Sequence, residues 1–125
     1  LFSGLSRLTG VRKERFRLQR IQNENEQQRL SLYKDIDDAC LSLRAAVEEH
    51  RQALEQLRTS TITLKESEEK WEEGMISVFE LMEKRNLYIM AKAELTRTRL
   101  QYELKRRLVD FYRTGVFVTL GSRQK

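Results

Sequence analysis

Most of the chain repeats its apolar residues with the period of an α-helix. From Ile36 onward, one mostly apolar series recurs every seven residues: Ile36, Leu43, His50, Leu57, Leu64 and Trp71. Three residues after members of this series comes a second series, of small side chains: Ala39, Ala46, Ala53, Ser60 and Ser67. A seven-residue repeat keeps one helix face against a neighbouring helix, and small residues on that face allow a close approach. The pattern therefore predicts a long helix that packs tightly on an antiparallel partner.

A second helix with the same period follows a single break. Its mostly apolar series is Leu81, Tyr88, Leu95, Tyr102 and Val109, with Ala91 and Thr98 between its members. The break is Gly74, the only glycine between Gly10 and Gly115 in a chain without proline. Ser77, with Glu80 three residues later, has the arrangement of a capping box at a helix start. We therefore predict that the chain reverses at Gly74 and returns as an antiparallel hairpin.

The predicted fold class is all-α: one long, coiled-coil-like hairpin with short extended ends. We expect a first helix over about 9–71, a tip over 72–77, a second helix over about 77–114 and a tail over 115–125, with extended segments at 1–5 and 116–121. At 1.5 Å per residue the first helix would be roughly 95 Å long and the second about 57 Å. The excess of about 38 Å contains a segment, 22–29, that is polar on every face. Residues 1–125 are accordingly expected to be one hairpin fragment of a larger helical assembly.

The charge is high and unevenly distributed. Charged residues make up 34% of the chain against 39% hydrophobic residues, a balance that favours extended helix over a globular core. Lysine and arginine number 24 against 19 acidic residues, which gives a net charge of +5. The basic residues crowd both ends, whereas Glu66, Glu68, Glu69, Glu72, Glu73, Glu80 and Glu83 surround the turn. A hairpin would place the bases toward its open end and the acids at its closed tip.

No arrangement of residues in the sequence indicates catalysis. Cys40 is the only cysteine, and His50, the only histidine, occupies a seam position without nearby ligands, so both are expected to be packing residues. We therefore expect no enzyme activity, no cofactor and no metal site. A basic series also repeats every seven residues beside the seam: Arg85, Lys92, Arg99, Arg106 and Arg113. It is expected to be a solvated flank that pairs with neighbouring acids. No apolar run is long enough to cross a membrane as a helix.

A set of residues in a defined order and spacing extends from the start of the chain to the end of the second helix. They are Leu1, Phe2, Gly4, Trp71, Gly74, Ser77, Glu80, Leu81 and Met82, followed by Leu87, Ala91, Leu95, Tyr102, Leu108 and Gly115. In this order and spacing they resemble the TolC family of outer-membrane efflux and secretion proteins. The resemblance covers essentially the whole chain, as the helical part of one structural repeat without its barrel strands. Three positions depart from the usual family pattern: Trp71 replaces a tyrosine, Glu80 an aspartate, and Ile76 a basic residue of some relatives.

The resemblance implies a homotrimeric channel in the cell envelope of a Gram-negative bacterium. Barrel strands outside this sequence would cross the outer membrane, and the helices would form a periplasmic duct whose inner end meets an adaptor protein and an inner-membrane pump. The adaptor-docking tip would consist of Trp71, Gly74, Met75, Ile76 and Ser77. By the same resemblance, Glu80 and Glu83 would line the lumen. Met75 and Ile76 are also expected to be exposed apolar residues at a reversal, where folding alone gives no reason for them.

Two other classes of protein remain open at this point. The first is the coiled-coil hairpin of a periplasmic adaptor protein, whose tip usually carries an Arg-Leu-Ser type of motif that Gly74–Ser77 lacks. The second is a basic helical arm that binds nucleic acid. In this chain the basic residues are interleaved with acids, and no base-stacking aromatics share a face with them. We therefore expect no nucleic-acid partner.

Overall fold

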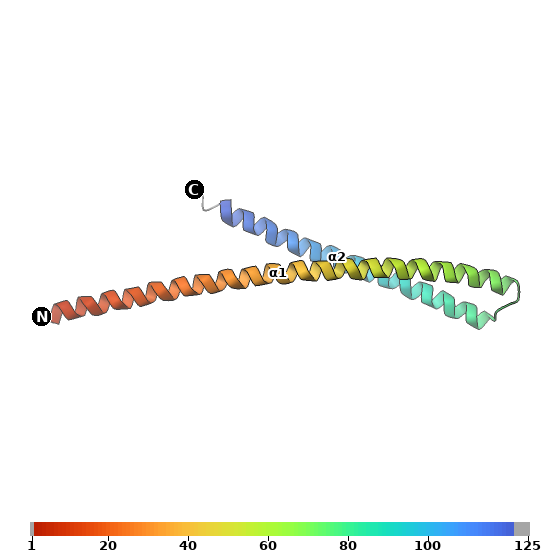
Figure 1. Cartoon of the computed structure of the whole chain (residues 1–125), viewed down its shortest axis with the longest axis horizontal. Coiled ribbons are helices and arrows are strands. Elements are labelled where there is room, and N and C mark those ends of the chain that lie inside the picture. The colour runs from red at the N-terminus through yellow and green to blue at the C-terminus, as the bar shows by residue number, and fades with distance from the viewer. Residues whose placement is uncertain (1, 122–125) are drawn as a thin grey trace. The chain divides into compact units, whose positions relative to one another are not determined.

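The computed structural model describes the backbone of residues 2–121 and the side chains of residues 3–115. It contains two helices, α1 (Phe2–Glu72) and α2 (Val78–Gly121), and no strand within the described residues. Figure 1 shows the chain reversing direction between them. The two helices pack against each other, so the prediction of an all-α hairpin is confirmed.

The predicted extended ends are wrong where the structure describes them. Residues 2–5 belong to α1, and α2 continues through Gly115 to Gly121 instead of ending near 114. A helical glycine costs about 1 kcal/mol relative to alanine, which weakens a helix without ending it. A helix ends when the backbone leaves helical geometry, and the only described residue with positive φ is Gly74. Residues 122–125 of the predicted tail lie outside the described residues.

The chain divides into two units, Leu1–Asp38 and Ala39–Lys125. In the first unit, every described side chain from residue 3 to residue 35 is exposed, and the polar segment 22–29 is helical. A helix without packed neighbours is only marginally stable in water. The second unit holds the hairpin, formed by the last part of α1 and by α2.

Small residues form the buried seam of the hairpin. The buried residues of the described chain are Ala39, Ala46, Ala53, Ser60 and Ser67 on α1, and Ala91 and Thr98 on α2. Larger residues beside them, such as Leu57, Leu64 and Leu95, are half-buried. The predicted close approach through small side chains is therefore confirmed. Because burial keeps a strict seven-residue spacing from Ala39 to Ser67, the seam does not drift around α1, and residues seven apart share a face along the hairpin.

Polar groups in the seam are paired. The Nδ1 atom of His50 lies 3.2 Å from Oγ1 of Thr98, whose hydroxyl donates to the carbonyl of Leu95 at 3.0 Å. The hydroxyl proton is used in that second bond, so Nδ1 of His50 is the donor in the first. The imidazole also stacks on Tyr102, with ring centroids 6.3 Å apart and planes 9° from parallel. His50 is thus a packed seam residue, as its position in the repeat predicts.

Candidate functional site

The candidate site is the tip, where a Schellman motif ends α1. The N–H of Met75 donates to the carbonyl of Lys70 at 2.8 Å, and the N–H of Gly74 donates to that of Trp71 at 3.0 Å. Gly74 has a φ of 73°, a left-handed conformation that suits a residue without Cβ. These bonds satisfy carbonyls at the end of α1 and fold the chain back at once. The predicted reversal at Gly74 is confirmed.

Ser77 caps α2, as its position predicts. The N–H of Glu80 donates to Oγ of Ser77 at 3.2 Å, and the N–H of Leu81 donates to the Ser77 carbonyl at 3.2 Å. Helix α2 begins at the next residue, Val78. Glu80 lies in the first turn of α2, where the helix dipole favours a negative charge. Gly74 and Ser77 therefore both have local structural roles in the turn.

Apolar side chains are exposed around this turn. Met75 is 70% exposed and Trp71 is 46% exposed, although Trp71 closes the seam series of α1. Ile76 is only half-buried, so the expectation of an exposed side chain holds for Met75 and in part for Ile76. Phe79 is 80% exposed and was not predicted as a site residue. The signal in the sequence was its place outside the seam series, two residues before Leu81.

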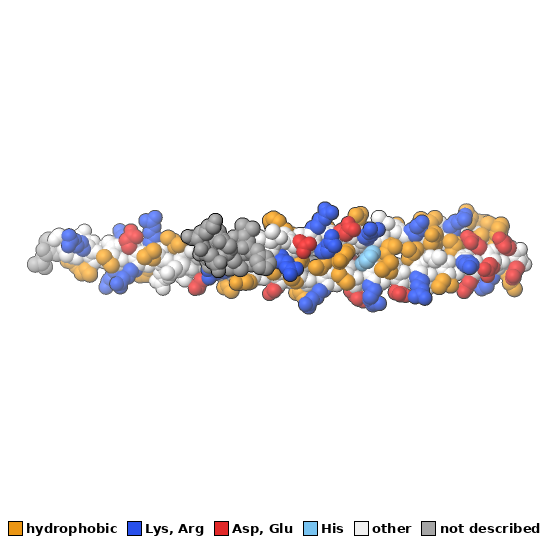
Figure 2. Space-filling model, turned by 90° about the horizontal axis from the view of Figure 1, so that it is seen from above, with side chains coloured by type: hydrophobic (Ala, Val, Ile, Leu, Met, Phe, Trp, Pro, Cys, Tyr) orange, Lys and Arg blue, Asp and Glu red, His pale blue; other side chains and the backbone are white. Residues whose placement is uncertain are grey.

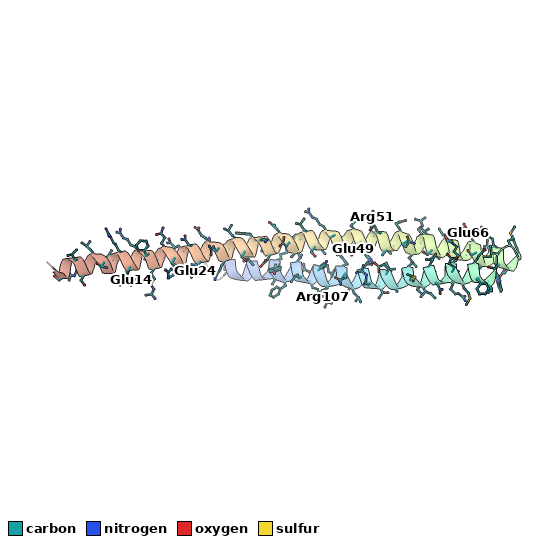
Figure 3. The ribbon with its side chains drawn as sticks, turned by 90° about the horizontal axis from the view of Figure 1, so that it is seen from below. Glu14, Glu24, Glu49, Arg51, Glu66 and Arg107 are labelled. Carbon is teal, nitrogen blue, oxygen red and sulfur yellow. The ribbon has the colours of Figure 1, made fainter. Side chains whose placement is uncertain are left out.

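Glu80 and Glu83 share a face with an ion-pair cluster farther along the hairpin. Arg97 lies 3.8 Å from Glu49 across the two helices and 2.6 Å from Glu94 on its own helix. The hydrogen bonds from Arg97 lower the pKa of the Glu94 carboxyl. Glu80 and Glu83 precede Glu94 and Arg97 by two seven-residue repeats each, so all four lie on one side of α2. We call this side of the hairpin the acidic face; Figure 3 shows Glu49 between the two helices.

Negative charge accumulates at the end of α1. Glu69 and Glu72 lie in its last turn and Glu73 directly follows it, and Lys70 is the only basic residue of the last turn. The C-terminal end of a helix carries partial negative charge, so acids are unfavourable there by about 0.3–1 kcal/mol each. Figure 2 shows acidic side chains gathered at the turn end of the hairpin. The tip therefore presents apolar side chains surrounded by carboxylates that its own helix does not neutralise.

The basic series of α2 lies beside the seam. The ammonium of Lys92 lies 5.4 Å from the centre of the Tyr88 ring, and Arg99 lies 3.6 Å from Glu103. Both basic side chains are exposed, and these contacts lie within α2 itself.

In the described part of the chain, no group of three or more His, Cys, Asp or Glu residues is placed to hold a metal ion. Neither helix, as far as it is described, is apolar enough over a sufficient length to span a membrane. Comparison with known proteins finds no matching family model, no matching curated protein and no matching solved structure.

Proposed function

We propose that the chain is a periplasmic helical hairpin of a trimeric outer-membrane efflux or secretion channel, and that its tip docks an adaptor protein. The observation that carries the proposal is the tip itself. A tight reversal at Gly74 leaves Met75 exposed, and Trp71 and Phe79, each four residues away in the sequence, are exposed as well. Acidic side chains gather at the same end of the hairpin (Figure 2). Exposed apolar side chains that contribute nothing to the fold are typical of a surface that binds a partner.

The residues of the tip do not all support docking equally. Gly74 and Ser77 are explained by the turn and the cap, so they support the hairpin rather than a partner. Met75 and Phe79 have no such role, since both are largely exposed. They are therefore the residues on which the docking proposal depends, with Ile76 contributing its exposed part.

The acidic face supplies the second half of the proposal. In the proposed duct, Glu80 and Glu83 face the lumen and favour the passage of cations, because fixed carboxylates raise the local concentration of positive ions. Both residues are exposed and lie on one side of α2. The barrel strands, the adaptor and the inner-membrane pump that this function requires are outside the present sequence.

The docking proposal is tested by changing the two largely exposed residues, Met75 and Phe79, to aspartate together in the full-length protein. The expected result is a folded, membrane-inserted trimer that no longer exports, because the partner's apolar surface would meet two carboxylates. Replacing both residues by leucine is the matched control and should preserve export. Normal export by the double aspartate variant would remove the docking proposal.

The lumen half is tested by changing Glu80 and Glu83 to glutamine. Single-channel recordings should show a lower preference for cations than the unchanged protein. Glu68→Gln serves as the control, since Glu68 lies near the tip but lines a groove on another side of the hairpin. Unchanged ion selectivity in the double variant would show that these carboxylates do not line the lumen.

A further inference from the structure

The hairpin has a second charged surface, turned away from the acidic face. A groove of about 350 Å³ opens between the helices, lined by Thr61, Leu64, Lys65 and Glu68 of α1 and by Arg85, Tyr88 and Ile89 of α2. At about 103° per residue in a seven-residue repeat, Lys65 lies about 155° around α1 from Glu49. By the same arithmetic Arg85 lies about 155° around α2 from Arg97. The groove therefore lies on the side opposite the Glu49–Arg97 ion pair.

Basic residues repeat along both margins of this groove. Lys65 is the last member of a seven-residue series on α1, and Arg85 is the first member of the series on α2. The two rows are Arg44, Arg51, Arg58 and Lys65 on α1, and Arg85, Lys92, Arg99, Arg106 and Arg113 on α2. All of them are exposed. We call these two rows and the groove between them the basic face; in Figure 2, Lys and Arg side chains lie along both margins of the hairpin.

The floor between the two rows is apolar. Leu64 of α1 and Tyr88 of α2 line the groove, and both are half-buried, as are Leu57 and Leu95 one repeat farther along. Val47 and Leu54 continue the floor along α1, and each is 48% exposed. The basic face is thus an apolar channel with a row of cations on each side.

Few acids of the hairpin neutralise these rows. Arg51 pairs with Glu48, and Arg99 pairs with Glu103, each on its own helix. Among the described residues, Lys65, Arg85 and Lys92 have no ion-pair partner, and Lys92 instead lies over Tyr88. The groove lining holds two cations, Lys65 and Arg85, and one carboxylate, Glu68, so its net charge is positive.

We infer that the basic face binds an amphipathic helix of a partner protein, one whose apolar stripe is flanked on both sides by Asp or Glu at seven-residue spacing. Successive cations in each row are about 10.5 Å apart along the helix axis, which is two helical turns. Acids flanking the seam of another helix recur at the same distance, and such flanking charges set which helices pair. The apolar stripe would fill the floor while both rows find opposite charges.

The same features argue against a single-stranded nucleic acid as the occupant. Grooves that bind single strands present aromatic side chains on which bases stack. Here Lys92 lies over the Tyr88 ring and Tyr102 stacks on His50, so each ring already has one face in contact with a neighbouring side chain. The inference does not rest on the channel proposal. In the proposed duct the basic face would point away from the lumen, so a helix could occupy it while Glu83 lines the lumen.

The test uses two synthetic helical peptides and the full chain. One peptide carries Leu and Ile at its core positions with Glu on both flanks, and the other carries Lys at the flanking positions. Fluorescence anisotropy should show binding of the Glu peptide alone, weakened about tenfold or more when the salt concentration rises from about 0.05 M to about 0.3 M. Circular dichroism of each protein variant verifies that the hairpin is intact.

Two double variants with equal change in net charge locate the binding. Arg85→Gln with Lys92→Gln should weaken binding of the Glu peptide about tenfold. Arg97→Gln with Arg107→Gln, outside the basic face, should leave it unchanged. Figure 3 shows Arg107 on the outer side of α2.

Several outcomes would overturn the inference. The first is failure of the Glu peptide to bind at about 100 μM. The second is binding of the Lys peptide with the same affinity as the Glu peptide. The third is an equal loss of affinity for the Glu peptide in the two double variants. Tighter binding of duplex DNA than of the Glu peptide would assign the face to nucleic acid. Salt-sensitive dimers of the chain that Arg85→Gln with Lys92→Gln dissociates would assign it to a second copy.

Discussion

One residue, Gly74, determines where the hairpin turns. Its φ of 73° lies in the left-handed region, and no heavy atom lies within 4 Å of the place where a Cβ would be. A side chain would therefore meet no neighbour, and the cost of substitution comes from the backbone alone. Glycines elsewhere in the described chain have no positive φ. Replacing them by alanine should therefore raise the free energy of unfolding, whereas replacing Gly74 should lower it.

The first prediction compares two glycine-to-alanine substitutions. Gly74→Ala should lower the free energy of unfolding by about 1–2 kcal/mol, the cost of a left-handed conformation for a residue with Cβ. Gly115→Ala, within α2 and with space for a methyl group, should raise it by about 0.5–1 kcal/mol. Urea denaturation followed by circular dichroism measures both. Two changes of the same sign would contradict this account of the turn.

A second prediction concerns two exposed carboxylates, Glu48 and Glu94. Hydrogen bonds from Arg51 and Arg97 lower the pKa of these groups below the ordinary value of 4.5. A lowered folded-state pKa gives stability that is present above the unfolded pKa and is lost as the pH falls through the folded pKa. Changing both residues to glutamine should therefore reduce the loss of thermal stability on going from neutral pH to about pH 3. Identical pH profiles would show that these pairs contribute nothing measurable.

At the scale of the helices, the sequence predicted the seam and the turn but not the helix ends. Burial of Ala39, Ala46 and Ala53 follows directly from their spacing. The end of α2 was predicted too early because Gly115 was expected to stop the helix. The free-energy cost of one glycine in a helix is too small to end it, and α2 continues to Gly121. The run 116–120 is also short and apolar, a pattern that fits strand or helix equally. In the site, the half-burial of Ile76 depends on the path of the turn, which residue spacing does not specify.

The third prediction tests the close approach of the helices. Ala46 is 2% exposed in the seam, and its neighbour Ala45 is exposed. Ala46→Leu should lower the free energy of unfolding by about 1–3 kcal/mol, because the added methylene groups force the helices apart. Ala45→Leu adds the same atoms on an exposed side and should change it by less than about 0.5 kcal/mol. Thermal or urea unfolding distinguishes them, and equal effects would mean that Ala46 is not at a tight contact.

Across the whole molecule, charge is divided in two ways. The sequence indicated a division along the hairpin, with acids near the turn. The structure adds a division around it, since the Glu49–Arg97–Glu94 cluster and the Lys65–Arg85 groove lie on different sides. This second division could not be read from the sequence alone, because it requires knowing which flank of α1 meets which flank of α2.

The fourth prediction concerns the unequal stability of the two units. Side chains 3–35 are all exposed, whereas residues 39–112 include the buried seam. Hydrogen exchange of the intact chain should therefore show rapid exchange of amides in 10–35 and slow exchange in 43–67 and 84–109. Mass spectrometry of peptides from the exchanged protein measures this. Equal protection along α1 would show that its first part is stabilised by packing in solution.

The small-residue seam has a mechanical consequence. The buried residues on its α1 side, from Ala39 to Ser67, are all small and recur every seven residues, and the larger seam residues are only half-buried. Separation of the helices would therefore proceed stepwise, one seven-residue repeat after another, starting at the end of the hairpin away from Gly74. The seam repeats nearest the turn are the last to separate, because the reversal at Gly74 and the cap at Ser77 keep the two helices joined there. Force applied at the open end would be absorbed step by step before it reached the tip.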